Sequence, residues 1–542
     1  MFISRDTRYR SPFGAVEQGH EVTFRICLPR EWACTAAWFV HREEETAQWN
    51  GMFWAGTEGD DREWWDCRYT PPRAGIYWYR FAIDTKYGRR FLVCQPDSSA
   101  TLSQNEGAEW QLTCYEKDFN TPEWLVGGLI YQVFPDRFAK AGTLKTQVPT
   151  DRVLRTDWGG QPQWRADADG IVHNTDFFGG DLQGIQKALP YLKRLGVTCL
   201  YLNPIFEAHS NHRYDTANYG EVDPLLGTKE DFKQLTTAAN ELGIRVMLDG
   251  VFNHTGADSV YFNKNGRYKE PGAYQSPESP YASWYRFSKW PMEYAAWWGF
   301  DTLPEVDELN PSFLEYILGK EGIARKWLKI GAAGWRLDVA DELPDEFLER
   351  LRTAVKETDS EAIILGEVWE DASNNKDSYG KLRRFLLGKE LDSVMNYPFR
   401  QAIIHYFCGG SARNFFNMIE SVLENYPPQV VRVLMNSLGT HDTERILTVM
   451  AGEPLNGRDR EWQAATNLSP EQRKRGITLL KLAAMVQYTL PGVPCLYYGD
   501  EVGLEGYRDP FNRGCFPWEE KNSELVSWFE RLGAVRASCT AL

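Results

Sequence analysis

The sequence contains no run of 18 or more apolar residues and no block of lysine and arginine. The first absence predicts that no segment spans a membrane, and residues 1–8 contain no apolar stretch long enough for a signal peptide. Lysine and arginine number 60 against 75 aspartate and glutamate, a net charge of −15, which leaves no basic patch for nucleic acid or an anionic membrane surface. We therefore expect a cytoplasmic, soluble protein with no nucleic-acid or membrane partner.

Cysteine is present, but not in paired motifs. The ten cysteines are scattered with no Cys-x-x-Cys pair, which argues against a zinc site or a disulfide framework and favours reduced thiols. The remaining composition is globular, with 43% hydrophobic and 25% charged residues, and 542 residues exceed the size of one core. Aromatic residues reach 14%. Flat rings bind the apolar faces of sugars or bases, and the acidic charge favours sugars.

The first part of the chain, residues 1–117, has the pattern of a β-sandwich. Segments with strand-like alternation, such as residues 21–26 and 76–83, are separated by glycine, proline and charged turns. No helical period interrupts them, so we expect packed antiparallel sheets.

Residues 122–542 have a different rhythm, in which short apolar segments alternate with amphipathic helical patterns. This alternation predicts a parallel (β/α)8 TIM barrel. A doubly wound sheet is the competing architecture, but eight units in series favour closure. The expected strands are residues 129–134, 197–202, 244–248, 334–337, 363–365, 393–396, 431–435 and 493–498. The clearest helical patterns cover residues 229–242, 313–330, 347–355 and 470–488.

One connection is much longer than the others. Residues 255–310, after the third expected strand, are rich in tyrosine, tryptophan, proline and glycine. Loops of this length in a compact domain are usually functional. We expect an inserted domain on the C-terminal face of the barrel, where such folds place their chemistry.

Polar side chains follow the carboxyl ends of several expected strands. Arg336 and Asp338 alternate along one strand, so both can reach the same pocket. Cleavage of a glycosidic bond needs a proton donor for the leaving oxygen and a carboxylate that faces the anomeric carbon. A nearby arginine keeps the nucleophile ionised, and a crowded site raises the pKa of the acid. The candidates are Asp249, His254, Arg336, Asp338, Glu367, His441 and Asp442.

Four segments resemble, in the same order, the signature regions of the α-amylase clan of glycoside hydrolases (family 13). They are residues 249–254, 334–340, 366–369 and 438–442. The resemblance implies that Asp338 is the nucleophile, that Glu367 is the general acid/base, and that Asp442 distorts and stabilises the bound sugar. Residues 211–215 and 509–513 also resemble sugar-binding segments of the clan. Together the resemblance implies a set of substrate-binding residues: Tyr214, His254, Arg336, Glu342, Trp369, His441, Asp509 and Arg513.

Two further segments, residues 9–16 and 124–138, resemble the neopullulanase, cyclomaltodextrinase and maltogenic amylase branch. That branch implies a retaining hydrolase of α-1,4 bonds in maltooligosaccharides, cyclomaltodextrins, pullulan or starch, with α-1,6 cleavage left open. It also implies a starch-binding-like N-terminal domain and a homodimer formed through it. Most tryptophans of that domain are expected in the core or the dimer interface, although they could also bind sugar: Trp49, Trp54, Trp64, Trp65 and Trp78.

The sequence departs from the branch at three places. Residues 303–307 read Leu-Pro-Glu-Val-Asp, whereas the branch carries Met-Pro-Lys-Leu-Asn. Residues 139–143 lack the Asn and Asp ligands of a calcium ion, and only Gly179 and Asp181 match later ligand positions. Hard Ca²⁺ needs several oxygen ligands, so we expect neither a metal nor another cofactor. The expected last barrel helix covers residues 524–535, and the family's C-terminal β domain is absent from the sequence up to Leu542. Either that domain is dispensable here or the chain is truncated.

Two alternatives remain open. A transglycosylase or glucosyl isomerase of the same clan would use the same catalytic segments. A catalytically inactive sugar-binding protein on the same barrel would be expected to have lost at least one of Asp338, Glu367 and Asp442, and all three are present.

Overall fold

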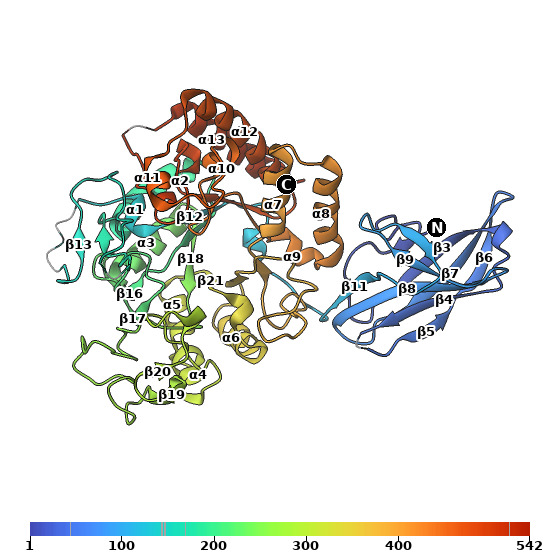
Figure 1. Ribbon diagram of the computed structural model, residues 1–542, viewed down its shortest axis with the longest axis horizontal. Helices are drawn as coiled ribbons and strands as arrows, with labels where there is room; N and C mark the ends of the chain where they lie inside the picture. Colours follow the sequence, from blue (N-terminus) through green and yellow to red (C-terminus); the bar gives the residue numbers. More distant parts are fainter. Residues whose placement is uncertain (44, 143–144, 146–147, 169, 520) are drawn as a thin grey trace. The chain divides into compact units, whose positions relative to one another are not determined.

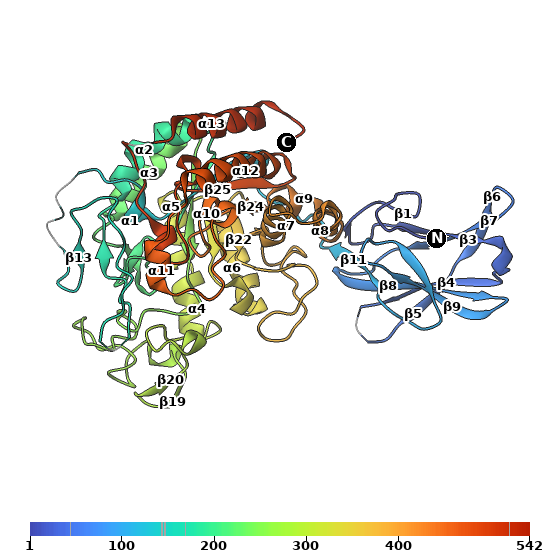
Figure 2. The same cartoon turned by 45° about the horizontal axis from the view of Figure 1, so that its top comes forward.

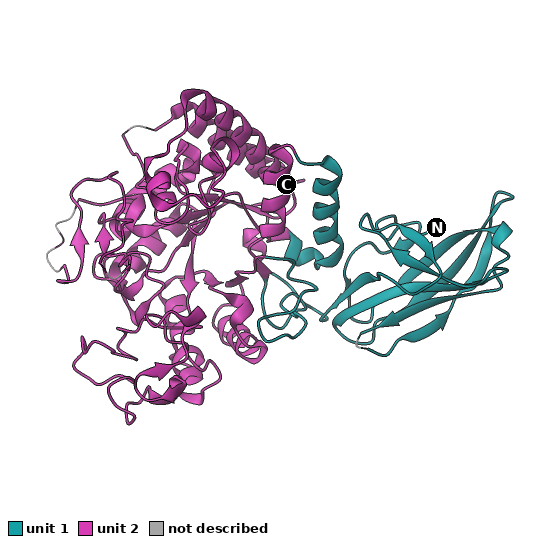
Figure 3. Ribbon diagram, in the orientation of Figure 1, with its two compact units in different colours: residues 1–121, 370–392, 410–431 teal, residues 122–369, 393–409, 432–542 magenta. Residues whose placement is uncertain are grey.

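The computed structural model describes residues 1–43, 45–142, 145, 148–168, 170–519 and 521–542. The chain divides into two compact units (Figure 3). Unit 1 contains Met1–Thr121, Glu370–Asp392 and Gly410–Val431, and unit 2 contains Pro122–Trp369, Ser393–Gly409 and Arg432–Leu542. The chain thus returns twice to unit 1 after leaving it. The predicted domain limits, 1–117, 122–542 and 255–310, do not include these returns and stay predictions.

Unit 1 is built on two β-sheets. The first sheet has the strand order β1 (Arg10–Ser11), β3 (Val22–Pro29), β7 (Arg62–Tyr69) and β6 (Phe53–Glu58). The second has the order β10 (Ala100–Ser103), β9 (Gly88–Cys94), β8 (Gly75–Thr85), β11 (Trp110–Tyr115) and β2 (Val16–Glu17), and β4 (Ala36–Arg42) joins β8 to β5 (Gln48–Gly51). Both strand segments expected from alternation lie in β3 and β8, so the predicted N-terminal sheet domain is confirmed.

The core of unit 1 lies between these sheets because alternate residues of each strand are apolar. Phe24 of β3 stacks on Phe39 of β4 with ring centroids 4.3 Å apart, and Tyr79 and Phe81 of β8 pack against them. Aromatic pairs in this arrangement add about 0.5–1.5 kcal/mol beyond the area that they bury. Sequence alternation and burial therefore agree along these strands.

The five tryptophans noted in this unit have different environments. Trp65 lies in the core, Trp64 and Trp78 are half-buried, and Trp49 and Trp54 are exposed. A role of the exposed pair in sugar binding or in a dimer stays a prediction.

The last segment of unit 1, Gly410–Val431, takes part in a buried ion cluster. Helix α8 (Ala412–Asn425) carries Glu424, whose two carboxylate oxygens lie 3.1 Å from Arg10 Nη1 and 3.1 Å from Arg5 Nε. Ser98 Oγ donates to Glu424 Oε2 at 3.3 Å. All three partners come from the N-terminal sheet region, so these contacts fix α8 to it.

Unit 2 contains a closed parallel barrel surrounded by helices (Figures 1 and 2). The strand order is β23 (Ser393–Val394), β22 (Ile363–Gly366), β21 (Gly334–Leu337), β18 (Arg245–Gly250), β15 (Cys199–Leu202), β12 (Ile130–Val133), β25 (Val493–Tyr497) and β24 (Met435–Ser437). A parallel bridge between Met395 and Met435 closes the ring. The predicted (β/α)8 barrel is confirmed.

One strand and one helix of the barrel differ from the expected elements. The seventh strand was expected at residues 431–435, but Pro428–Arg432 forms helix α9 and the strand begins at Met435. The helix expected over residues 313–330 is two helices, α4 (Pro311–Leu318) and α5 (Ile323–Ile330), because Gly319 and Gly322 separate them. Glycine disfavours a continuous helix, which explains the break.

The remaining barrel helices follow the expected alternation. They include α2 (Leu182–Arg194), α3 (Lys229–Glu241), α6 (Asp345–Thr358), α12 (Pro470–Thr489) and α13 (Ser523–Ser538). Within the part of the chain that the structure describes, no helix is both long and apolar enough to cross a membrane.

The long connection after β18 carries little regular structure. It contains the short turns η3 (Ala282–Trp284) and η4 (Trp297–Gly299) and the hairpin β19 (Phe287–Lys289) and β20 (Glu293–Tyr294). A backbone bridge between His254 and Glu305 brings its end back to the C-terminal end of β18. This return keeps the connection at the face of the barrel where the candidate residues lie.

Candidate active site

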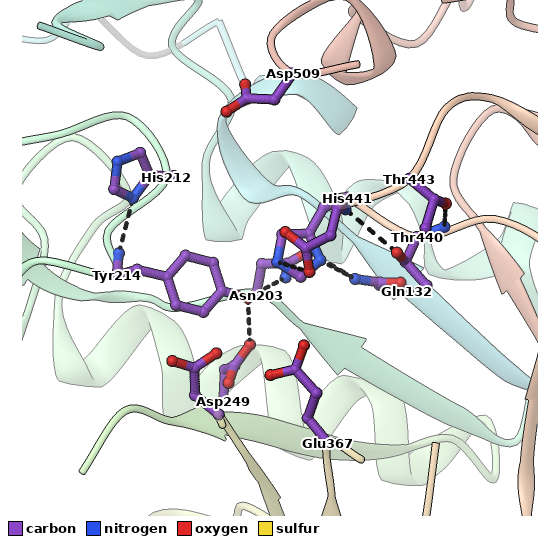
Figure 4. Close-up of polar contacts among 12 residues, drawn as sticks. Gln132, Asn203, His212, Tyr214, Asp249, Glu367, Thr440, His441, Thr443 and Asp509 are labelled. Carbon is purple, nitrogen blue, oxygen red and sulfur yellow. Dashed lines mark hydrogen bonds and ion pairs between the residues drawn. The ribbon is translucent and has the colours of Figure 1, made fainter. Parts of the chain in front are cut away.

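The strand register places the predicted catalytic residues on neighbouring strands. Asp249 pairs with Arg336, and Leu337 pairs with Gly366, so that Asp338 and Glu367 follow the ends of adjacent strands. The side chains of Asp249, Glu367, Tyr214 and His441 converge from different strands and loops (Figure 4).

A single buried arginine contacts three carboxylates. Arg336 Nη1 donates to Asp249 Oδ1 at 2.9 Å and to Asp338 Oδ1 at 2.8 Å. Its Nη2 forms an ion pair with Glu367 Oε2 at 2.9 Å. The side chain of Arg336 is 0% exposed, so these are its immediate counter-charges. Three carboxylates against one guanidinium leave an excess of negative charge in a largely buried site.

Several carboxylates of this site have raised pKa values. Burial raises the pKa of Asp338 well above its usual range, Glu367 and Asp249 add to the rise, and Arg336 opposes it. Burial also raises the pKa of Asp249, against Arg336 and the tyrosine donors. Burial and Glu367 raise the pKa of Asp442 to about 7. The group therefore retains a proton near neutral pH, as expected where like charges share one site.

The contacts of Glu367 show where a proton can sit on it. Oε2 accepts from Val339 N at 2.9 Å and faces the positive charge of Arg336, whereas Oε1 accepts from Trp369 Nε1 at 3.1 Å. A proton on Oε2 would lie against a cation, so Oε1 is the favoured site. Trp369 is 44% exposed and stacks on Tyr397 at 4.0 Å, which fixes the direction of its indole N–H.

The residue after the predicted nucleophile has a strained backbone. Val339 has a φ of 40°, which is rare for a β-branched residue. Such conformations cost roughly 1–3 kcal/mol and cluster at functional sites. Here the turn aims the Val339 N–H at Glu367.

His441 is held as one neutral tautomer. Asn203 Nδ2 donates to the Tyr214 hydroxyl at 2.9 Å, which leaves Asn203 Oδ1 to accept from Gln132 Nε2 at 3.1 Å. The same Gln132 amide lies 2.9 Å from His441 Nδ1. Nδ1 is then the acceptor, and the proton is on Nε2, 3.2 Å from Asp442 Oδ2. Burial lowers the pKa of His441 well below its usual value, in agreement with a neutral ring.

Tyr214 and Arg513 complete this group. The Tyr214 hydroxyl donates to Asp249 Oδ2 at 2.8 Å, and its ring is parallel to His441 with centroids 5.1 Å apart. Arg513 Nη2 lies 3.6 Å from Asp442 Oδ1, and its Nη1 lies 3.1 Å from Asp509 Oδ1.

His254 and Glu342 belong to a second group, joined by Trp297. His254 Nδ1 donates to Asn253 Oδ1 at 3.1 Å, and its ring stacks on Trp297 at 5.1 Å. Burial lowers the pKa of His254 to about 4, so its Nε2 is an unprotonated acceptor, and it has no hydrogen-bond partner among the described residues. Trp297 Nε1 donates to Glu342 Oε2 at 3.0 Å.

Several residues of the site were not predicted. Tyr201 donates to Asp249 Oδ2 at 2.6 Å, and Gln132 and Asn203 orient His441 as described above. Glu308 is 4% exposed and accepts from Asn253 Nδ2 at 3.4 Å. A polar residue inside an apolar barrel strand, such as Gln132, is a usable signal, because burial there demands a partner.

Asp181, one of the two residues that match calcium-ligand positions, makes other contacts in the structure. Asp181 caps helix α2 by accepting from Gly184 N, accepts from Ala141 N, and pairs with Lys145 Nζ at 2.6 Å. Thr143 of the segment compared above lies outside the described residues. Among the described residues, no three or more His, Cys, Asp or Glu side chains gather as metal ligands. The expectation that no metal or cofactor is needed stays a prediction.

The fold and the site define a class: a parallel (β/α)8 barrel with an acid–base group of carboxylates at the C-terminal ends of its strands. Comparison with protein families extends this. Residues 132–531 match the family "Alpha amylase, catalytic domain". The chain therefore belongs to the α-amylase family.

Relatives of known name lie within the same family. An amylopullulanase of Thermoanaerobacterium saccharolyticum is 35% identical over 98% of this chain and 44% of its own length. Neopullulanase 2 of Thermoactinomyces vulgaris is 35% identical over 86% of this chain and 72% of its own. A solved structure of a cyclomaltodextrinase has a TM-score of 0.66 at 29% identity, covering 98% of this chain and 84% of the other. The chain spans less than half of the length of the amylopullulanases that it matches.

Proposed function

We propose that the protein is a retaining α-glucan hydrolase that cleaves α-1,4 and α-1,6 glucosidic bonds in maltooligosaccharides, cyclomaltodextrins, pullulan or starch. The observation that carries the proposal is the shared contact of Asp338 and Glu367 with one guanidinium. In retaining glycosidases the two carboxyls stand about 5–5.5 Å apart, because no water has to fit between them in the first step. Relatives named amylopullulanase and neopullulanase support both linkages.

In the first step, Asp338 is the nucleophile and Glu367 is the acid. An Asp338 oxygen bonds to the anomeric carbon while that carbon's bond to the glycosidic oxygen breaks, and the proton on Glu367 Oε1 passes to the leaving oxygen. The carboxylates around Arg336 share a proton, and the reactive arrangement is the one in which that proton lies on Glu367. The ion pair with Arg336 Nη1, at 2.8 Å, then stabilises the ionised form of Asp338.

In the second step, Glu367 removes a proton from water, whose oxygen bonds to the anomeric carbon and displaces Asp338. Both charges return to their starting positions, and the configuration is retained.

The other predicted residues bind the sugar that reacts. Tyr214 offers a ring face held by its hydroxyl contact with Asp249, and His441 offers its Nε2 proton. His254 Nε2, which has no hydrogen-bond partner in the described parts of the chain, can accept from a sugar hydroxyl. Asp442, which lies beside Arg513, accepts hydrogen bonds from sugar hydroxyls. These roles match the resemblance and stay proposals.

The alternatives have less support. The inactive alternative expects a missing carboxylate, yet Asp338, Glu367 and Asp442 are all present at one end of the barrel. Relatives named for hydrolysis do not favour the transglycosylase or isomerase alternative. A cytoplasmic location, a starch-binding role of the N-terminal unit and a homodimer through it stay predictions, and a solution mass measurement tests the dimer.

The direct test is a digest of pullulan, cyclomaltodextrin, starch and maltotriose with chromatographed products, combined with proton NMR of the first product. We expect hydrolysis with the α anomer formed first. A β anomer in the first minutes, or no hydrolysis of any of the four substrates, contradicts the proposal.

A further inference from the structure

Trp298 is an exposed tryptophan with an unusual backbone. It lies in the short turn η4, its side chain is 76% exposed, and its φ is 50°. Large residues rarely adopt this left-handed conformation, and strain of this kind persists where function requires it. Neither burial nor backbone preference therefore explains the position of this ring.

A carboxylate holds the ring in place. Glu342 Oε1 accepts from Trp298 Nε1 at 3.0 Å, while Oε2 accepts from Trp297 Nε1 at 3.0 Å. The two indoles stack with centroids 5.3 Å apart and planes at 26°. With both N–H groups fixed at their edges, the rings are pre-organised and the outer face of Trp298 is left to solvent.

The pair of rings continues the predicted sugar site. Trp297 stacks on His254 with planes at 27°. The Nε2 of His254 is a predicted sugar contact, and no described residue hydrogen-bonds to it. Glu342 follows Asp338 in the chain by one short turn, η5 (Ala340–Glu342). Three stacked rings thus lead from the group around His254 to the exposed face of Trp298.

We propose that Trp298, oriented by Glu342, is a platform for one further glucosyl unit of the α-glucan chain, beyond the sugars at the bond that is cleaved. This inference rests on the proposed function and names a subsite within it. A pyranose ring has an apolar C–H face that matches an indole face, and its hydroxyls can donate to Glu342. Met292 and Phe300, in the same connection, are also exposed, so an apolar protein partner is the competing occupant that the experiment must separate.

The experiment compares kcat/KM along a series of maltooligosaccharides, from maltotriose to maltoheptaose, together with an aryl maltoside. Trp298→Gly removes the ring and suits the positive φ, so it should not impair folding. For the longest oligosaccharides we expect a loss of about tenfold, mainly in KM, which corresponds to about 1.4 kcal/mol. We expect less than about a twofold change for the aryl maltoside, which cannot reach the platform. Trp298→Phe should recover part of the loss because it restores a ring.

The matched control is Phe416→Ala on α8, an exposed aromatic residue in unit 1, which should change no member of the series. A loss that is equal for all substrate lengths, or no loss for the longest, overturns the platform. Binding of an apolar partner would give one of these two results. If the wild-type protein hydrolyses none of the substrates, the proposed function fails instead, so the two failures are distinguishable.

Discussion

The two units each contain a buried ion cluster, and the two clusters have opposite charge ratios. In the barrel, Arg336 contacts three carboxylates. In unit 1, the carboxylate of Glu424 contacts two arginines, Arg5 and Arg10, and the hydroxyl of Ser98. The barrel cluster has more carboxylates than cations. In unit 1, by contrast, the carboxylate of Glu424 is contacted by two cations and a hydroxyl.

The difference separates a reactive cluster from a structural one. An excess of buried carboxylates costs stability, because at least one must hold a proton or remain poorly solvated. That cost persists where the proton is used, as in acid–base catalysis. The carboxylate of Glu424, paired with two cations, instead fixes one segment of the chain to another. The ratio of charges, rather than burial alone, therefore distinguishes the two.

The largest expected effect comes from removing one charge of the barrel cluster. Asp338→Asn should lower kcat by about 10³-fold or more, since the nucleophile is lost. The melting temperature should stay equal or rise, because the substitution relieves repulsion within the cluster. Steady-state kinetics and thermal unfolding of the same preparation measure both. Near-normal turnover of Asp338→Asn would remove the assignment of the nucleophile.

Removing the charge of Glu424 in the structural cluster should lower stability and leave kcat unchanged. Glu424→Gln removes the carboxylate that pairs with the buried Arg10, and breaking a buried pair costs about 3–5 kcal/mol in the free energy of unfolding. The kcat of the folded protein should be unchanged. The control is Glu420→Gln, because Glu420 also pairs with Arg5, at 2.9 Å, but its side chain is 50% exposed. That pair should contribute less than about 1 kcal/mol. Equal losses in the two variants would contradict the structural role of Glu424.

The sequence predicts the barrel cluster far better than the structural one. The alternation of Arg336 and Asp338 and the position of Glu367 at the next strand end follow from local periodicity and from parallel register. Arg10 and Glu424 are 414 positions apart, and no local pattern joins them. The turn at Val339 is also invisible in the sequence, because tertiary contacts impose its φ against its own preference.

The ends of helices and strands are predicted less well than the barrel cluster but better than the structural cluster. Gly319 and Gly322 were visible as helix breakers, yet the apolar period on both sides concealed the break between α4 and α5. At the seventh strand, the apolar run before Met435 could form helix or strand, and packing selected helix α9 for part of it.

Glu308 extends the comparison to pH. Burial raises its pKa to about 8, and its Oε1 accepts a long hydrogen bond from Asn253 Nδ2 at 3.4 Å. In the unfolded chain a glutamate titrates near pH 4, so between about pH 4 and 8 the folded protein binds one more proton than the unfolded chain. Stability from this group is therefore present at low pH and lost as the pH rises through that window.

We compare the free energy of unfolding of Glu308→Gln with that of the wild type. We expect the variant's advantage to be about 3 kcal/mol larger at pH 8 than at pH 5. Denaturant unfolding of both proteins at the two pH values measures this. Glu305→Gln is the control from the same connection, because Glu305 is only part-buried and its contact with Arg286 is 3.5 Å long. A difference between wild type and Glu308→Gln that does not depend on pH would show that Glu308 is charged in the folded state.

The smallest effect concerns the hydrogen bond from Trp369 to Glu367. Trp369→Phe keeps a ring against Tyr397 but removes the indole N–H that holds Oε1. We expect kcat to fall by about tenfold, or about 1.4 kcal/mol, for glucan substrates that need a protonated leaving group. An aryl maltoside with a good leaving group should be less affected, because its leaving group needs less protonation. Trp369→Ala removes the stacked ring as well, so a KM increase confined to that variant separates sugar contact from proton positioning. Equal losses for both substrate types in Trp369→Phe would reduce Trp369 to a sugar contact alone.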